Sequence, residues 1–121
     1  EGQPRHRDAK GGAAARHGAE APRSLTAFVP LVDTTAASGL GPPEFWPGSH
    51  ASDWREPEGG RGVAPDLPRG AALLFDGRLL HRGCPNRGSQ WRPLFYAVWA
   101  QPGYADANFP AESLLADAAR D

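Results

Sequence analysis

Two histidines and one aspartate have the residue types and the spacing of metal ligands. His6 and Asp8 lie two positions apart in "QPRHRDAK" (3–10). In an extended segment, residues i and i+2 point to the same side of the backbone. His81 ends a distant apolar stretch, and with it the set comprises two imidazoles and one carboxylate. This is the facial set that holds non-heme Fe(II) and leaves coordination positions open for chemistry.

One guanidinium belongs with these residues. Arg92 stands just before the apolar run 94–100, as His81 stands at the end of another. If the two runs pair as a hairpin about the middle of 82–91, we expect His81 and Arg92 to lie roughly opposite each other on one face. A buried cation without a partner is costly. A metal for His81 and a carboxylate ligand for Arg92 would satisfy both, because a guanidinium offers two parallel donors that lysine cannot reproduce.

Each of these residues also has a purely structural interpretation. His6 and Asp8 belong to a charged stretch that is typical of a solvated loop. His81 alone is compatible with a satisfied core histidine, and Arg92 with an ion pair to Asp76. The joint placement of the four residues is what favours a functional site.

The segments that must position these residues are predicted to be short strands. Apolar runs with β-branched or aromatic residues, separated by turn formers, predict an antiparallel sandwich or barrel. These runs are 24–32, 70–75, 79–81 and 94–100. Residues 9–22 and most of 36–70 are interpreted as irregular, and 110–120 is the one helix candidate.

Other polar and aromatic residues are interpreted as structural. His50 follows the tight turn at "WPGS". We expect its side chain to be structural, with a position near the mouth of the substrate pocket and not among the metal ligands. Trp46, Trp54 and Trp91 are predicted to pack in the core or at its rim. His17 and Cys84 receive no role.

Composition limits the class of protein. A chain of 121 residues with 40% hydrophobic and 22% charged residues predicts one globular domain, residues 1–121. A net charge of −1 indicates no nucleic-acid or membrane partner, and a lone cysteine excludes a disulfide framework. No signal peptide or membrane span is visible, which favours the cytoplasm. The lack of any methionine indicates a processed product, an excised domain or an incomplete gene model, and we expect a C-terminal fragment of a longer chain.

Four motifs occur in an order that resembles a known family. "HRD" (6–8) is followed by "FVPLVD" (28–33), "GPPEFWPGSH" (41–50) and "FDGRLLHRGCPNRGSQWRPLFY" (75–96). The last two are the specific ones. The chain resembles the phytanoyl-CoA dioxygenase-like Fe(II)/2-oxoglutarate oxygenases, which share a double-stranded β-helix (jelly-roll) core.

The resemblance implies a site and an activity. His6, Asp8 and His81 would bind Fe(II), and Arg92 would pair with the distal carboxylate of the cosubstrate 2-oxoglutarate. O2 would react at the remaining position, and an unknown small or lipid-like substrate would be hydroxylated. Related halogenating enzymes lack the carboxylate, so Asp8 favours hydroxylation.

Two departures and two alternatives accompany this expectation. The N-terminal elements of the family barrel are expected to be absent, and Gly83 replaces a hydroxyl that some relatives carry near the cosubstrate. That hydroxyl would have to come from Ser24, Thr26 or Ser89. The alternatives are a cupin-like metal- or ligand-binding module without turnover, and a metal-dependent isomerase or hydrolase. Arg92 discriminates between them, because an oxygenase of this kind needs it for a dicarboxylate.

Overall fold

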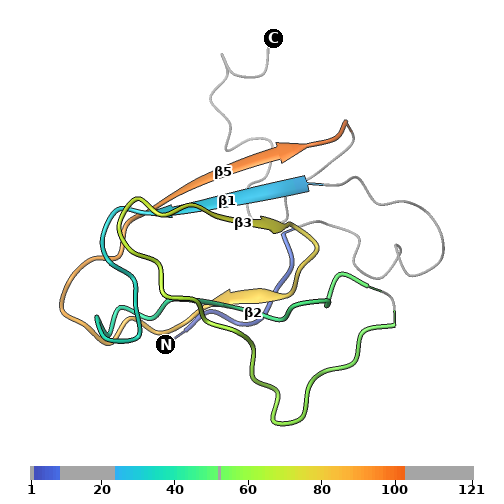
Figure 1. Cartoon of the computed structure of the whole chain (residues 1–121), viewed down its shortest axis with the longest axis horizontal. Helices are drawn as coiled ribbons and strands as arrows, with labels where there is room; N and C mark the ends of the chain where they lie inside the picture. The colour runs from blue at the N-terminus through green and yellow to red at the C-terminus, as the bar shows by residue number, and fades with distance from the viewer. Residues whose placement is uncertain (1, 9–23, 52, 103–121) are drawn as a thin grey trace.

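The computed structural model describes residues 2–8, 24–51 and 53–102. These residues form two antiparallel sheets stacked as layers, with no helix among them (Figure 1). One sheet has the order β3-β1-β5 and the other pairs β2 with β4. The strands are β1 (Ser24–Pro30), β2 (Pro43–Phe45), β3 (Leu73–Asp76), β4 (His81–Gly83) and β5 (Leu94–Ala100).

The central strand β1 alternates between the two faces of its sheet, as a half-buried strand should. Ser24, Thr26 and Phe28 are buried, whereas Leu25 is exposed. Phe28 is paired with Leu73 of β3 and with Tyr96 of β5. The inner face of this sheet therefore carries aromatic rings at the level where β3, β1 and β5 run side by side.

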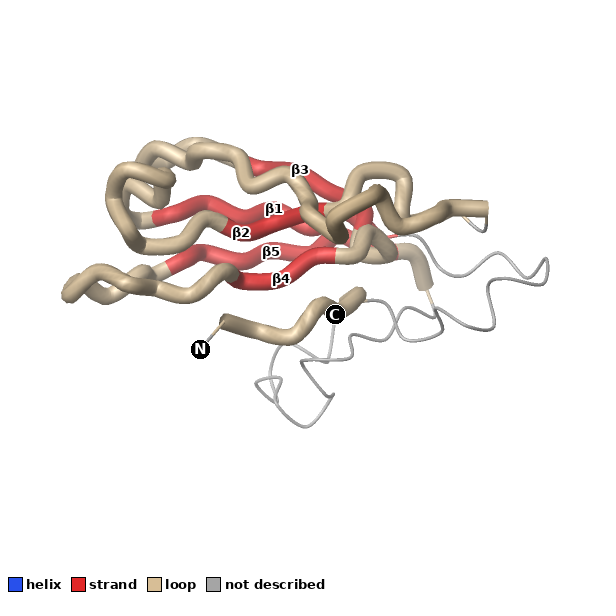
Figure 2. The backbone as a smooth tube through the Cα atoms, turned by 90° about the horizontal axis from the view of Figure 1, so that it is seen from below, coloured by secondary structure: helices blue, strands red, loops and turns tan. Residues whose placement is uncertain are grey.

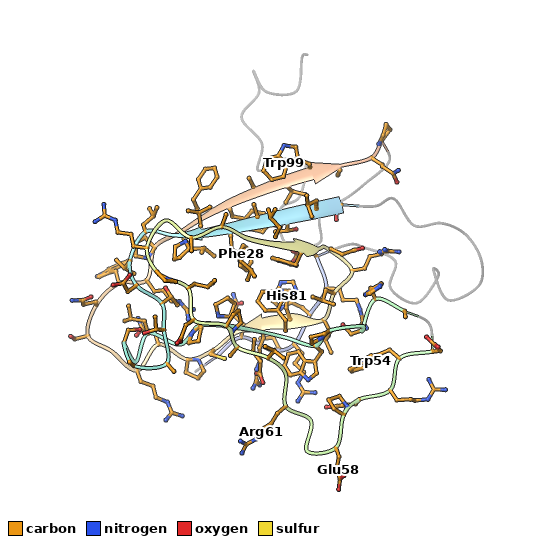
Figure 3. The ribbon with its side chains drawn as sticks, viewed as in Figure 1. Phe28, Trp54, Glu58, Arg61, His81 and Trp99 are labelled. Carbon is orange, nitrogen blue, oxygen red and sulfur yellow. The ribbon has the colours of Figure 1, made fainter. Side chains whose placement is uncertain are left out.

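The core between the layers is a small aromatic cluster. Phe28, Phe45 and Phe75 are buried together, and the Phe75 ring centroid lies 4.9 Å from each of the other two. The edge-to-face geometry of both pairs is the favoured one for aromatic rings. His81 projects into this cluster from the second layer, so the core itself fixes the position of one predicted ligand (Figure 3).

The second layer is widened by chain segments that flank its two short strands. His6 forms an antiparallel bridge with His81, and Val63 forms one with Phe45. Gln3 donates its backbone N–H to the carbonyl of Gly83. The N-terminal segment therefore runs beside β4 (Figure 2), and this pairing brings residue 6 to residue 81 across the length of the chain.

Most strand predictions are confirmed, with two corrections. Strands lie in all four predicted runs or at their ends, but β2 forms inside the stretch interpreted as mostly irregular. The predicted hairpin between His81 and Arg92 is wrong. β4 pairs with β2 and β5 pairs with β1, so the connection 84–93 crosses from one sheet to the other. The predicted loop 9–22 and helix 110–120 lie outside the described residues.

The outer face of the three-stranded sheet is apolar. Leu25, Leu74, Phe95 and Trp99 are exposed there, and Figure 3 shows Trp99 on the side of β5 away from the core. Of the tryptophans expected to pack, Trp46 is buried but Trp91 is 90% exposed, so the packing prediction is wrong for Trp91. In the part of the chain that the structure describes, no helix has the length and apolar character to span a membrane.

Candidate metal centre

The structure brings the three predicted metal ligands together. His6 Nε2 lies 3.8 Å from Asp8 Oδ1, and His81 Nε2 lies 3.5 Å from the same oxygen. The ligand atoms of all three residues lie within 4.8 Å of one another. Two imidazoles and one carboxylate therefore lie close together, a donor set that fits a divalent cation such as Fe(II).

Both histidines are oriented by a backbone carbonyl two residues earlier. His6 Nδ1 lies 2.9 Å from the carbonyl oxygen of Pro4, and His81 Nδ1 lies 2.9 Å from that of Leu79. A carbonyl can only accept, so each Nδ1 carries the hydrogen and donates it. Each Nε2 then bears the lone pair that a metal needs, and it is the Nε2 atoms that face Asp8.

Burial disfavours the charged form of His81. Its side chain is 3% exposed and packs against the rings of Phe45 and Phe75, with the Phe45 ring stacked at 5.7 Å. Burial lowers the pKa of His81, although the hydrogen bond to Leu79 and the charge of Asp8 act in the opposite direction. Metal binding requires a deprotonated Nε2, so this environment favours binding at neutral pH.

Asp8 is held by two elements. Its backbone N–H donates to the carbonyl of Gly77, in the turn between β3 and β4, at 3.0 Å. The hydroxyl of Tyr96 donates to Asp8 Oδ2 at 3.3 Å. Asp8 is 2% exposed, so these contacts satisfy a polar group whose burial would otherwise be costly.

Arg92 lies at the same cavity but does not pair with Asp76. Its Nη1 donates to the carbonyls of Leu40 at 2.8 Å and Cys84 at 3.0 Å, and also to that of Gly41. Asp76 is instead paired with Arg78. The structural alternative of an Arg92–Asp76 pair is therefore wrong, and the guanidinium ties two loops together at the edge of the pocket.

The three candidate ligands and Arg92 line one pocket of about 490 Å³. Its walls are mostly apolar, which suits a site that must exclude water. The apolar lining residues are Pro4, Phe28, Pro30, Pro43, Leu67 and Leu94, and the further polar ones are Gln3, Thr34 and Tyr96. The position of His81 and Arg92 on one cavity thus arises from two facing sheets and not from a hairpin.

The hydroxyls at the pocket differ from those expected. Ser89 is exposed, and Ser24 and Thr26 are buried side chains that do not line the cavity. Thr34 and Tyr96 supply the lining hydroxyls instead. Tyr96 could have been suspected from its inward phase in β5, two residues after Leu94, whereas Thr34 has no sequence signal that separates it from an ordinary loop threonine.

His50 lies apart from the three candidate ligands. It is exposed, and it does not line the pocket. Its neighbour Ser49 is buried and accepts the backbone N–H of Leu80 at 2.7 Å. The Pro-Gly-Ser-His turn therefore supports the segment that leads into β4.

Two solved structures resemble this fold. The crystal structure of EvdMO1 matches with a TM-score of 0.62 and 29% sequence identity, over 84% of this chain and 23% of that one. The crystal structure of AviO1 from Streptomyces viridochromogenes matches with a TM-score of 0.63 and 24% identity, over 86% of this chain and 45% of that one. The chain therefore spans less than half the length of either protein. Together with the two antiparallel layers, these matches confirm the all-β jelly-roll class.

The sequence itself matches a family model. Residues 1–94 match that of phytanoyl-CoA dioxygenase, and this range contains His6, Asp8, His81 and Arg92. The match, the jelly-roll layers and the convergent donor set agree with one another. The chain belongs to the phytanoyl-CoA dioxygenase family.

Proposed function

We propose that this chain carries the catalytic centre of an Fe(II)- and 2-oxoglutarate-dependent dioxygenase that hydroxylates a small or lipid-like substrate. The observation that supports this is the convergence of two imidazoles and one carboxylate within 4.8 Å, in a pocket that Arg92 also lines. O2 is the other reactant. We expect no nucleic-acid or membrane partner and a cytoplasmic location.

The residues divide the work between metal and cosubstrate. Nε2 of His6, Nε2 of His81 and Oδ1 of Asp8 would hold the iron. When bound, iron and 2-oxoglutarate supply the oxidising chemistry that breaks a substrate C–H bond with O2. The chain's own contribution is to orient the ligands through the Pro4 and Leu79 carbonyls, and to exclude water with Phe28 and its apolar neighbours.

Arg92 is arranged to receive a carboxylate. Its Nη1 is held by backbone carbonyls, which fixes the plane of the guanidinium. A Cβ on residue 83 would lie 3.3 Å from Arg92 Nη2, so Gly83 keeps space open beside that nitrogen. Thr34 lines the same cavity, and its buried hydroxyl donates to the carbonyl of Val32 at 3.2 Å. This space supports the assignment of the distal carboxylate of 2-oxoglutarate to Arg92.

The same carbonyl contacts favour a second candidate function. Three backbone acceptors on one nitrogen are also what a purely structural arginine would have. In that case the chain would be a cupin-like metal-binding module without turnover. The two candidates differ in whether 2-oxoglutarate binds next to the metal.

Anaerobic titration separates the candidates. We expect the chain to bind Fe(II) and then 2-oxoglutarate, with the appearance of the visible metal-to-ligand absorption band. Succinate, which lacks the oxo group, serves as the control and should not produce the band. Tight Fe(II) binding without any band on addition of 2-oxoglutarate would contradict the oxygenase and favour the binding module.

A further inference from the structure

The two oxygens of Asp8 face different partners. Oδ1 is the oxygen near both histidines, at 3.8 Å from His6 Nε2 and 3.5 Å from His81 Nε2. Oδ2 accepts the hydroxyl of Tyr96 at 3.3 Å. The carboxylate is therefore oriented with one oxygen toward the metal position and the other toward β5.

Tyr96 is well fixed for this contact. It lies opposite Phe28 in the register of β1 and β5, and the two rings pack with centroids 5.5 Å apart. Asp8 comes from the N-terminal segment beside β4, so the hydrogen bond links the two layers across the pocket. A ring held by core packing defines where its hydroxyl can point.

We propose that Tyr96 is a positioning residue that keeps Asp8 a one-oxygen ligand of the metal. This inference rests on the proposed function. A six-coordinate ion held by two imidazoles and one carboxylate oxygen would keep three positions open. A 2-oxo acid would take two of them, and O2 would need the third. If Asp8 bound through both oxygens, only two coordination positions would remain, and the cosubstrate and O2 would compete for them.

Tyr96→Phe tests this role because it removes the hydroxyl and keeps the ring that packs on Phe28. The variant removes the hydrogen bond from residue 96 to Oδ2 of the buried carboxylate, and turning toward the cation would compensate for that loss. Nitric oxide is the probe for the third open position. We expect the Fe(II)–2-oxoglutarate complex of the variant to bind nitric oxide about tenfold or more weakly than wild type, as measured by electron paramagnetic resonance titration.

Trp99→Phe is the matched control, since Trp99 lies on the same strand and is 59% exposed on the outer face. It should bind nitric oxide as wild type does. A second measurement uses wild type alone. The infrared difference spectrum between metal-loaded and metal-free chain should show the wide splitting of carboxylate bands that one-oxygen binding produces.

The outcomes separate the two proposals. Equal nitric oxide affinity in wild type and Tyr96→Phe, or the narrow splitting of two-oxygen binding in wild type, would overturn the role of Tyr96 while the oxygenase assignment stands. A variant that unfolds at a lower temperature but binds nitric oxide equally would show that Tyr96 only packs, which also overturns it. A wild-type chain that binds no Fe(II) would overturn the proposed function and this role together.

Discussion

At the scale of single residues, the site depends on which ring nitrogen carries a hydrogen. The carbonyls of Pro4 and Leu79 orient His6 and His81 in the same way, each two residues before the ring it accepts from. The antiparallel bridge between the two histidines places these arrangements side by side. Backbone atoms therefore provide the support that many metal sites obtain from carboxylates.

Replacing His81 with alanine should abolish tight iron binding. The change removes one of three protein ligands. Loss of a mere supporting hydrogen bond weakens metal binding by about 10–100-fold, so the Fe(II) dissociation constant should rise by more than that. Anaerobic equilibrium titration measures this. His50→Ala is the control, because His50 is exposed and does not line the pocket, and its affinity should match wild type. Loss of iron in His50→Ala, or retention in His81→Ala, would refute the assignment of ligands.

Arg92→Lys keeps the charge and discards the planar fork. We expect 2-oxoglutarate to bind more weakly by about 1–3 kcal/mol, with Fe(II) affinity nearly unchanged, because a bidentate charge-assisted pair is lost. Isothermal titration of each ligand in turn provides both values. If Fe(II) and 2-oxoglutarate weaken equally, Arg92 acts through the loop carbonyls it contacts and not on the cosubstrate.

At the scale of elements, the site is assembled by segments that cross between layers. The connection 84–93 carries the chain from β4 to β5, and the carbonyls of Leu40, Gly41 and Cys84 meet at Arg92. Gly41 has a φ of 70°, which favours glycine, and a Cβ there would lie 2.2 Å from the carbonyl oxygen of Pro85. The loop before β2 can approach the connection 84–93 only because residue 41 has no side chain.

Gly41→Ala should therefore weaken both the fold and cosubstrate binding. The positive φ alone destabilises a non-glycine residue by about 1–3 kcal/mol, and the overlap with Pro85 adds to that. Gly70→Ala is the matched control, since Gly70 has a φ of 81° with nothing within 4 Å of its Cβ position. Urea unfolding and 2-oxoglutarate titration of the two variants are compared. Equal losses in both variants would show that the approach of the two loops is unimportant.

The turn after β3 should make stability depend on pH. Burial acts to raise the pKa of Asp76, but the hydrogen bonds and charge of Arg78 outweigh it and the pKa is lowered from its ordinary value of 3.8. A carboxyl whose pKa is lower in the folded state stabilises the fold at pH values above its ordinary pKa of 3.8. This contribution is lost as the pH falls through the lowered pKa of the folded state. Asp76 is partly exposed, so solvent screening limits the effect.

Asp76→Asn should accordingly destabilise the chain by about 0.5–1 kcal/mol at pH 7. The difference from wild type should shrink as the pH is lowered below 3.8, because the wild-type carboxyl is then increasingly protonated. Denaturant unfolding of both proteins at a series of pH values measures this. A difference that stays constant down to the lowest pH would mean that the charge of Asp76 is not what stabilises the turn.

At the scale of the whole molecule, the candidate metal site joins three parts of the chain. The N-terminal segment, residues 2–8, contributes His6 and Asp8. Strand β4 contributes His81, and strand β5 contributes Tyr96. A ligand that binds only when these parts are assembled stabilises the folded state by mass action. Bound metal should therefore raise the stability of the whole chain and not only of the site.

Thermal unfolding with and without ligands tests this coupling. With free Fe(II) at 100 times its dissociation constant, stability should rise by about 2.7 kcal/mol, and further with 2-oxoglutarate. For a domain of this size that corresponds to a rise in Tm of roughly 10 °C. The measurement is made under anaerobic conditions, and His81→Ala should show no rise. A wild-type Tm that is unaffected by both ligands would argue against a preformed metal site.

Local periodicity in the sequence was enough to predict several features. Strand geometry places His6 and Asp8 on one side of an extended segment, because successive side chains alternate with a period of two. The apolar runs at 24–32 and 94–100 contain β1 and β5 for the same reason, since alternate residues must face a core. These properties depend on neighbours within a few residues, and a sequence carries that information directly.

Only the tertiary structure decided which strands pair and which side chains meet across the pocket. β5 pairs with β1 over seven positions, from Ser24–Ala100 to Pro30–Leu94, whereas β4 offers only three residues for pairing. The chain therefore crosses from one sheet to the other between His81 and Arg92 and does not form a hairpin there. That crossing places Tyr96 opposite Asp8, 88 positions away in the chain. Such contacts depend on long-range packing free energy summed over whole strands, and no local pattern encodes it.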